Sequence, residues 1–169
     1  MPDIASFELG PGVKVVWDDL DALRASLTDP EARAPWRLEG DLGTGFSALR
    51  VLTVATEAGS LLLVAGARPA GADGHDAENP QAALISGSGD VTVMEEALVS
   101  TQYAANGNIE RATVELYAEG DDYPVRGAGD AVGAAGSDEG PVRRECATLE
   151  FRLDGESGFA VFDVLHSIV

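Results

Sequence analysis

Two groups of side chains in this 169-residue sequence are of types that move protons or hold a small molecule. The first lies in the segment Pro69–Pro80, where His75 and Asp76 stand among further acidic residues. An imidazole beside carboxylates can act as a general acid or base, although an exposed acidic loop has the same composition. The second is Arg126 and Asp130, which four residues of extended chain separate by about 13 Å on one face of a strand. Small residues between them leave room for a ligand or for another side chain. These four are the candidate catalytic residues.

Three tyrosines could supply aromatic walls to such a site. Tyr103, Tyr117 and Tyr123 each combine a large apolar ring with one hydroxyl, and with Arg126 and Asp130 they are the predicted ligand-binding residues. Packing in the core or at its rim explains the same tyrosines without a ligand. Both interpretations stay open at the level of sequence.

The sequence predicts neither a metal site nor a cofactor. The single cysteine, Cys146, cannot build a cysteine zinc or iron–sulfur site, and the spacing around His75 matches no calcium loop. The glycines Gly127, Gly129 and Gly133 fit a dinucleotide-binding pattern, but no helix follows them to hold a pyrophosphate. We therefore expect small residues in a bent or crowded strand, and a free, inert thiol at Cys146.

Charge and hydropathy exclude several classes of partner. Asp and Glu total 29 against 11 Lys and Arg, a net charge of −18, which repels nucleic acid and anionic membrane surfaces. The longest strongly apolar stretch, Leu61–Ala67, is far shorter than a membrane-spanning helix, and Met1–Leu9 has no basic leader followed by an apolar run. These features predict one soluble, cytoplasmic domain over residues 1–169.

The elements that would position these residues are mostly strands. Asp19–Leu27 has leucines at helical spacing after an acidic start and predicts the one N-terminal helix. In Ile109–Glu119 apolar and polar residues alternate, as in a half-buried antiparallel strand. Counting similar segments gives about nine or ten strands, with a glycine-rich loop predicted at Gly133–Gly140 and one long strand at Val91–Tyr103. The fold class is therefore mainly β, an antiparallel β-barrel or closed β-sandwich.

The last predicted strand, Phe159–His166, is apolar on both faces and must be covered on both. Either it is buried inside one chain, or it forms the contact of a homodimer. The side chains expected at such a contact are Phe159, Val161, Phe162 and Val164.

The carboxyl-terminal part of the sequence resembles a known family. The resemblance covers about the last 75 residues and lies in hairpin turns and their flanking strands, at Gln102, Tyr103, Asn106, Gly107, Arg111–Glu115, Phe151–Gly155, Gly158 and Phe159. In these residues the chain resembles the second half of lipocalin-like proteins related to carotenoid hydratases and terpenoid or tocopherol cyclases. The resemblance implies a lipocalin-like barrel. It also implies that the family's other barrel half is missing or is supplied by another copy.

Two functions follow from these expectations. The first is binding of a small, mostly apolar metabolite of isoprenoid or polyketide type in a β-barrel cavity, with or without cyclase- or hydratase-like activity. It requires a cavity lined by several of Arg126, Asp130, Tyr103 and Tyr117. The alternative is a non-catalytic accessory or assembly protein with a filled interior and an apolar contact through Phe159–Val164. The sequence does not decide whether the protein is an enzyme.

Overall fold

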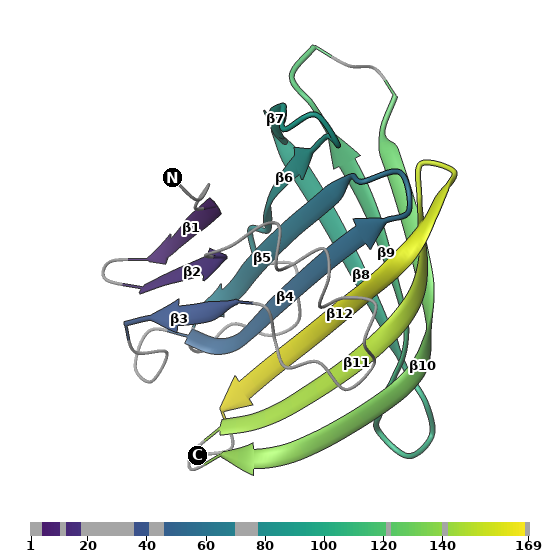
Figure 1. Ribbon diagram of the computed structural model, residues 1–169. Helices are drawn as coiled ribbons and strands as arrows, with labels where there is room; N and C mark the ends of the chain where they lie inside the picture. Colours follow the sequence, from purple (N-terminus) through teal and green to yellow (C-terminus); the bar gives the residue numbers. More distant parts are fainter. Residues whose placement is uncertain are drawn as a thin grey trace.

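The computed structural model describes residues 5–10, 13–17, 36–40, 46–69, 78–120, 123–139 and 142–167. These residues form twelve strands, every pair of which is antiparallel, in a sheet of three strands and a sheet of nine (Figure 1). This confirms the predicted mainly β fold. The predicted helix Asp19–Leu27 lies outside the described residues. Within the described ranges, no helix is long and apolar enough to cross a membrane.

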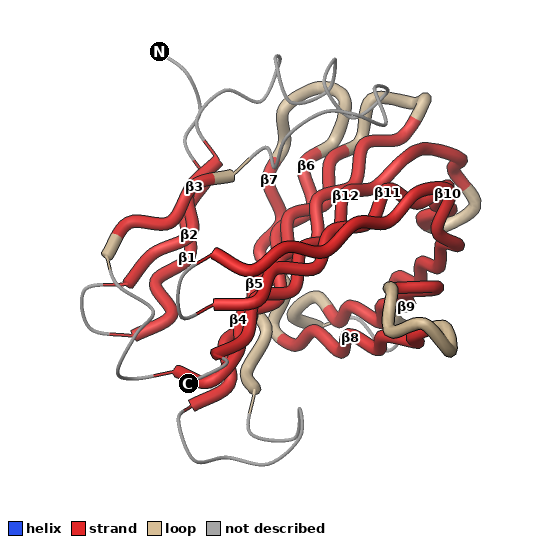
Figure 2. Tube along the Cα trace, turned by 90° about the horizontal axis from the view of Figure 1, so that it is seen from below, coloured by secondary structure: helices blue, strands red, loops and turns tan. Residues whose placement is uncertain are grey.

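The large sheet is curled into a half-barrel. Its strand order is β7-β6-β5-β4-β12-β11-β10-β9-β8, and β8 and β9 are turned under the rest of the sheet (Figure 2). Its strands are β4 (Phe46–Thr56), β5 (Leu61–Pro69), β6 (Gln81–Ile85), β7 (Val91–Val93), β8 (Glu96–Tyr103), β9 (Ile109–Tyr117), β10 (Val125–Glu139), β11 (Val142–Leu153) and β12 (Glu156–Ser167).

Two predicted hairpins have the expected turn chemistry. Gly107 has φ 88° in the turn between β8 and β9, and Asp154 and Gly155 have φ 50° and 84° between β11 and β12. In the β11–β12 turn, positive φ at both central residues is the geometry that matches the twist of two antiparallel strands, and Asp and Gly tolerate it well. In the β8–β9 turn Gly107 supplies the one positive φ. These turns fix the register of the strands they join.

The predicted strand Val91–Tyr103 is in fact two strands, because the chain crosses there from one edge of the half-barrel to the other. Met94 N donates to Ala82 O on β6, and the next amide, Glu95 N, donates to Tyr117 O on β9. The Met94 side chain is buried in the concave core. Two consecutive backbone groups therefore join the two sides of the curled sheet at this end.

The predicted loop Gly133–Gly140 is also different in the structure. Strand β10 continues to Glu139 and pairs with β11 along this length, with a register shift between Ala131 and Gly133. A bulge lets the strand bend while pairing resumes beyond it, so a glycine-rich composition here marks a bent strand rather than a loop.

Each face of the large sheet has its own apolar core. On the concave face the fully buried side chains come from all strands except β7 and β10, with Met94 from the β7–β8 connection. They are Leu52, Val54, Leu62, Val64, Ala82, Met94, Ala97, Ile109, Ala112, Val114, Leu116, Ala147, Leu149, Phe151, Leu153, Ala160, Phe162 and Val164. This core fills the apolar part of the half-barrel.

On the convex face, the part formed by β4, β5, β6 and β12 is covered by the small sheet, β1 (Ala5–Gly10), β2 (Val13–Trp17) and β3 (Arg37–Glu39) (Figure 1). Trp17 Nε1 donates to Thr53 Oγ1 on β4 at 3.0 Å. Trp36 Nε1, just before β3, donates to Asp163 Oδ2 on β12 at 2.7 Å. The second core consists of Phe7, Val15, Trp17, Leu49, Val51, Leu61, Leu63, Ala65, Ala83, Ile85 and Val161.

This arrangement explains why the last strand is apolar on both faces. Val161 is 1% exposed on the convex side, and Phe162 and Val164 are 0% and 3% exposed on the concave side; Phe159 is half-buried. The strand is thus buried inside one chain, which is the first of the two alternatives. Val161, Phe162 and Val164 are covered by the chain's own elements, so these three side chains are not exposed for the expected homodimer contact.

Candidate functional site

The concave face changes from apolar to polar toward one end. On β4 the inward-facing positions run from Val54 and Leu52 to Arg50, because side chains alternate along a strand. On β8 the inward series Ala97 and Val99 continues to hydroxyl-bearing residues, and on β11 the series from Phe151 to Ala147 continues to a carboxylate. The polar end is made by Arg50, Arg68, Glu78, Thr101, Tyr103 and Glu145.

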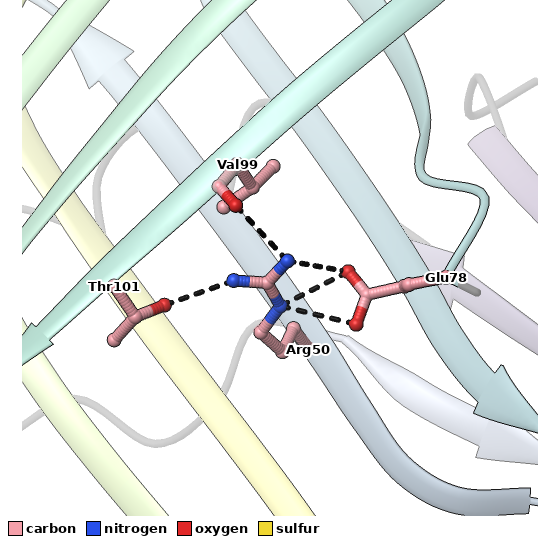
Figure 3. A network of polar contacts seen from close by, with 4 residues as sticks. All are labelled: Arg50, Glu78, Val99 and Thr101. Atoms are coloured by element: carbon pink, nitrogen blue, oxygen red, sulfur yellow. Dashed lines mark hydrogen bonds and ion pairs between the residues drawn. The ribbon is translucent and has the colours of Figure 1, made fainter. Parts of the chain in front are cut away.

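The centre of the polar end is a buried ion pair. Arg50 Nη2 lies 2.7 Å from Glu78 Oε1, and the two side chains are 3% and 1% exposed. Arg50 also donates from Nη1 to Thr101 Oγ1 and from Nη2 to Val99 O, both at 3.0 Å (Figure 3). The guanidinium thus reaches from the middle of the sheet to the edge strand β8.

The fold makes room for this pair at a glycine. Gly66 on β5 is the cross-strand partner of Arg50, and a Cβ at Gly66 would lie 2.8 Å from Glu78 Oε1. A side chain at position 66 would therefore displace the carboxylate. Glu78 itself belongs to the segment that leads into β6, so residues from β4, β5, β8 and the segment before β6 converge here.

A hollow of about 560 Å³ lies beside the ion pair. Arg50 and Glu78 form its charged wall, and Thr101 contributes a hydroxyl. The rest of the lining is Pro80, Ala97, Leu98, Val99 and Ser100. Ligand pockets commonly have this size and this combination of apolar lining with a few polar groups.

Tyr103 lies at the same end of the concave face. Burial is the main cause that raises the pKa of its hydroxyl, and the positive charge of Arg50 opposes it; Glu145, Arg68 and Glu78 act more weakly. The residue as a whole is 46% exposed. The hydroxyl therefore stays protonated at neutral pH and can donate a hydrogen bond from an accessible position.

The structure places most of the predicted site residues elsewhere. Arg126 and Asp130 do share one face of β10, but it is the convex face, where Arg126 pairs with Glu115 at 3.8 Å and Asp130 with Arg111 at 2.7 Å. These are cross-strand pairs between opposite charges, which stabilise a sheet without any ligand. The prediction that Arg126, Asp130 and Tyr103 line one cavity is therefore wrong, because Arg126 and Asp130 lie on the convex face and Tyr103 lies on the concave face.

The remaining predicted residues are also apart from the polar end. Tyr117 is on the convex side of β9 and donates to Glu115 Oε2 at 3.1 Å, and Tyr123 is 86% exposed. His75 and Asp76 lie outside the described residues. Of the residues predicted to bind a ligand, Tyr103 is the one placed at the polar end of the concave face.

Arg50 and Glu78 were not among the residues predicted from the sequence. The signal for Arg50 was present, because an arginine in the middle of an otherwise apolar strand is rarely buried unless it has a partner. The identity of that partner could not be predicted, since Glu78 is 28 residues away and lies among several other acidic residues.

Cys146 is the free thiol that the sequence predicts. Burial, followed by the negative charge of Asp163 and a hydrogen bond to it, raises the pKa of this thiol to about 12, while Arg144 lowers it slightly. The thiolate is the reactive form, so the raised pKa agrees with the expected low reactivity of this thiol. Within the described ranges, no three metal-ligating side chains come together.

The strand order and curl define the class of fold, an antiparallel half-barrel compatible with the lipocalin-like resemblance. Among solved structures, the chain is similar to a crystal structure from Nitrosomonas europaea described as a candidate AttH protein. The two chains are 11% identical with a TM-score of 0.54, over 97% of this chain and 58% of that one. This chain therefore spans less than two thirds of that protein's length, and the likeness concerns the fold alone. No protein-family model and no curated protein matches the sequence.

Proposed function

We propose that this protein binds a small, mostly apolar molecule at the polar end of the half-barrel. The observation that carries the proposal is the buried ion pair Arg50–Glu78 in the wall of a hollow of about 560 Å³. Burying two charges costs several kcal/mol, so an ion pair is a costly way to fill a core that apolar residues could fill. Its place in the lining of a hollow is explained if it orients a ligand.

The donors at this end define the polar part of the ligand. Four of the five N–H hydrogens of Arg50 donate hydrogen bonds to described residues. The fifth, on Nη1, has no acceptor among the described residues. The protonated hydroxyl of Tyr103 is a second donor. Both suit a carbonyl or hydroxyl oxygen, while Glu78 disfavours an anionic group. The apolar lining suits a hydrocarbon body, as in an isoprenoid or an aromatic polyketide.

Catalysis would need one further step at the same place. A tyrosine hydroxyl that stays protonated can donate a hydrogen bond to an isoprenoid or polyketide oxygen and so polarise it. Tyr103 is the described candidate for that role, as a hydratase or cyclase would require. The accessory-protein alternative loses its proposed surface, because Val161, Phe162 and Val164 are buried in the chain itself.

Binding can be tested with two probes of the proposed chemistry, farnesol for isoprenoids and emodin for aromatic polyketides. Native mass spectrometry of freshly purified protein would first reveal any molecule that stays bound. Titration calorimetry should then show saturable binding of at least one probe, weakened about three- to tenfold by Tyr103→Phe, which removes one hydrogen bond. Tyr123→Phe is the matched control and should bind as the wild type does. The proposal fails if neither probe binds, or if both variants bind equally well.

A further inference from the structure

A second hollow, of about 510 Å³, lies on the convex face of the large sheet, the face opposite to the polar end. Its floor is the small residues Gly127 and Ala128 on β10, and its walls come from β9, β11 and the β11–β12 turn. The wall residues are Thr113, Val114, Glu115, Arg126, Arg152 and Gly155. Ala128 is the cross-strand partner of both Thr113 and Arg152, so its small methyl group leaves a depression between two larger side chains.

Two arginines meet over this floor. Arg152 is directly opposite Ala128 on β11, and Arg126 stands two residues away on the same face of β10, a diagonal separation of about 7–8 Å. Arg126 has one distant ion-pair partner, Glu115 at 3.8 Å. The guanidinium of Arg152 makes no ion pair or hydrogen bond within the described part of the chain. The side chain of Arg126 is 71% exposed, so both heads are open to a ligand.

Two neighbouring arginines without a close carboxylate partner are unusual in this acidic protein. Acidic residues outnumber basic ones by 29 to 11, and Arg37, Arg50, Arg111, Arg143 and Arg144 each have a carboxylate within 3.3 Å. Arginine beside carboxylate is thus the rule in this structure. The lining of the hollow holds two arginines and one carboxylate, Glu115, which lies on the β9 side of Arg126, away from Arg152. The lining itself therefore carries one more positive charge than negative.

We infer that the convex hollow is a binding site for a small organic acid, with its carboxylate between Arg126 and Arg152 and a short apolar body over Ala128. Arginine suits this role because its planar group can donate two parallel hydrogen bonds to one carboxylate. Glu115 lines the same hollow, and its carboxylate is engaged by Arg126 and by the Tyr117 hydroxyl. The site is independent of the polar end and uses none of its residues.

Octanoate is a suitable probe, and 1-octanol is its uncharged counterpart of the same length. Calorimetry should show saturable octanoate binding that weakens as salt is added, and octanol binding at least tenfold weaker. Arg152→Gln and Arg126→Gln should each weaken octanoate binding about tenfold, as expected for loss of a charge-assisted hydrogen bond. Arg111→Gln is the matched control, since Arg111 is on the same face but outside the hollow, and it should bind within twofold of the wild type.

Three results would overturn this site: no saturable binding of octanoate, equal binding by the two hollow variants and the wild type, or an equal loss in Arg111→Gln. Both hollow substitutions change exposed side chains, so unchanged circular dichroism will show that the variants are folded. An Arg50→Met/Glu78→Leu double variant should still bind octanoate, which separates this site from the one at the polar end.

Discussion

Arg50 Nη2 donates a hydrogen bond to Val99 O, which joins a side chain on central strand β4 to the backbone of edge strand β8 across the concave face. At the other end of the same opening, the amides of Met94 and Glu95 join β6 to β9. The two sides of the half-barrel are therefore held by backbone hydrogen bonds at one end and by a charged side chain at the other. Arg50 thus has a structural role besides the proposed binding role, and the two can be separated.

Removing one partner of the Arg50–Glu78 pair should be strongly destabilising. Glu78→Gln leaves the Arg50 charge buried, and we expect the free energy of unfolding to fall by about 3–5 kcal/mol. The double variant Arg50→Met/Glu78→Leu replaces both charges with apolar groups and should recover most of that loss. Urea unfolding followed by circular dichroism measures both. A Glu78→Gln protein as stable as the wild type would contradict the buried geometry.

Asp163 should anchor the small sheet to the large one. It is 0% exposed, accepts from Trp36 Nε1 at 2.7 Å and pairs with Arg144 at 3.1 Å. Asp163→Ala leaves both donors without this acceptor, and we expect the free energy of unfolding to fall by about 2–4 kcal/mol. Urea unfolding followed by circular dichroism and by tryptophan fluorescence measures this change. Asp130→Asn is the control: Asp130 is 73% exposed, and its loss should cost less than about 1 kcal/mol. Equal costs would argue against the anchor.

Burial of Cys146 predicts a dependence on alkaline pH. The pKa of the thiol is about 12 in the folded protein against an ordinary value of 9.0, so the folded state holds this proton more tightly than the unfolded state does. The resulting stability is complete below pH 9 and is lost as the pH rises from 9 toward 12. Urea midpoints should therefore fall more steeply between pH 8.5 and 10.5 for the wild type than for Cys146→Ala. Parallel curves would contradict the raised pKa.

The same burial should protect the thiol from alkylation. A rise in pKa from 9.0 to about 12 lowers the thiolate fraction near neutral pH by about a thousandfold. Iodoacetamide should modify the unfolded chain quickly and the folded chain far more slowly. Asp163→Asn should speed the reaction of folded protein, because the Asp163 charge is one cause of the raised pKa. Equal rates in folded and unfolded protein would contradict this account.

Two glycines of β10 should respond oppositely to alanine. A Cβ at Gly129 would lie 2.5 Å from Phe151 Cδ2 and 2.8 Å from Glu150 O, whereas a Cβ at Gly133 would meet nothing within 4 Å. Gly129→Ala should lower the melting temperature through overpacking that costs about 1–3 kcal/mol. Gly133→Ala should leave it unchanged or raise it, since alanine restricts the unfolded chain. Equal effects would show that Phe151 does not pack on β10 as described.

These two glycines also show where sequence reasoning was sufficient. The prediction of small residues in a crowded or bent strand is confirmed at both places, by Phe151 above Gly129 and by the register shift before Gly133. Alternation and turn residues identified the antiparallel strands, because these signals are local. The error at Gly133–Gly140 arose because cross-strand pairing with β11 overrides the low strand preference of glycine.

The site was harder to predict because its residues are brought together by the curl of the sheet. Alternation placed Arg126 and Asp130 on one face, but it could not say whether that face was concave or convex. Contact between Arg50 and Thr101, which are 51 residues apart, depends on β8 being turned under the sheet. No local pattern in the sequence specifies that curvature.

The central claim is that a small molecule binds at the polar end of the half-barrel, and amide chemical-shift mapping tests it most directly. With farnesol or emodin added to saturation, the largest shifts should fall at Arg50, Glu78 and the strand segment Ala97–Tyr103. Shifts confined to other strands, or no shifts with either probe, would contradict the claim.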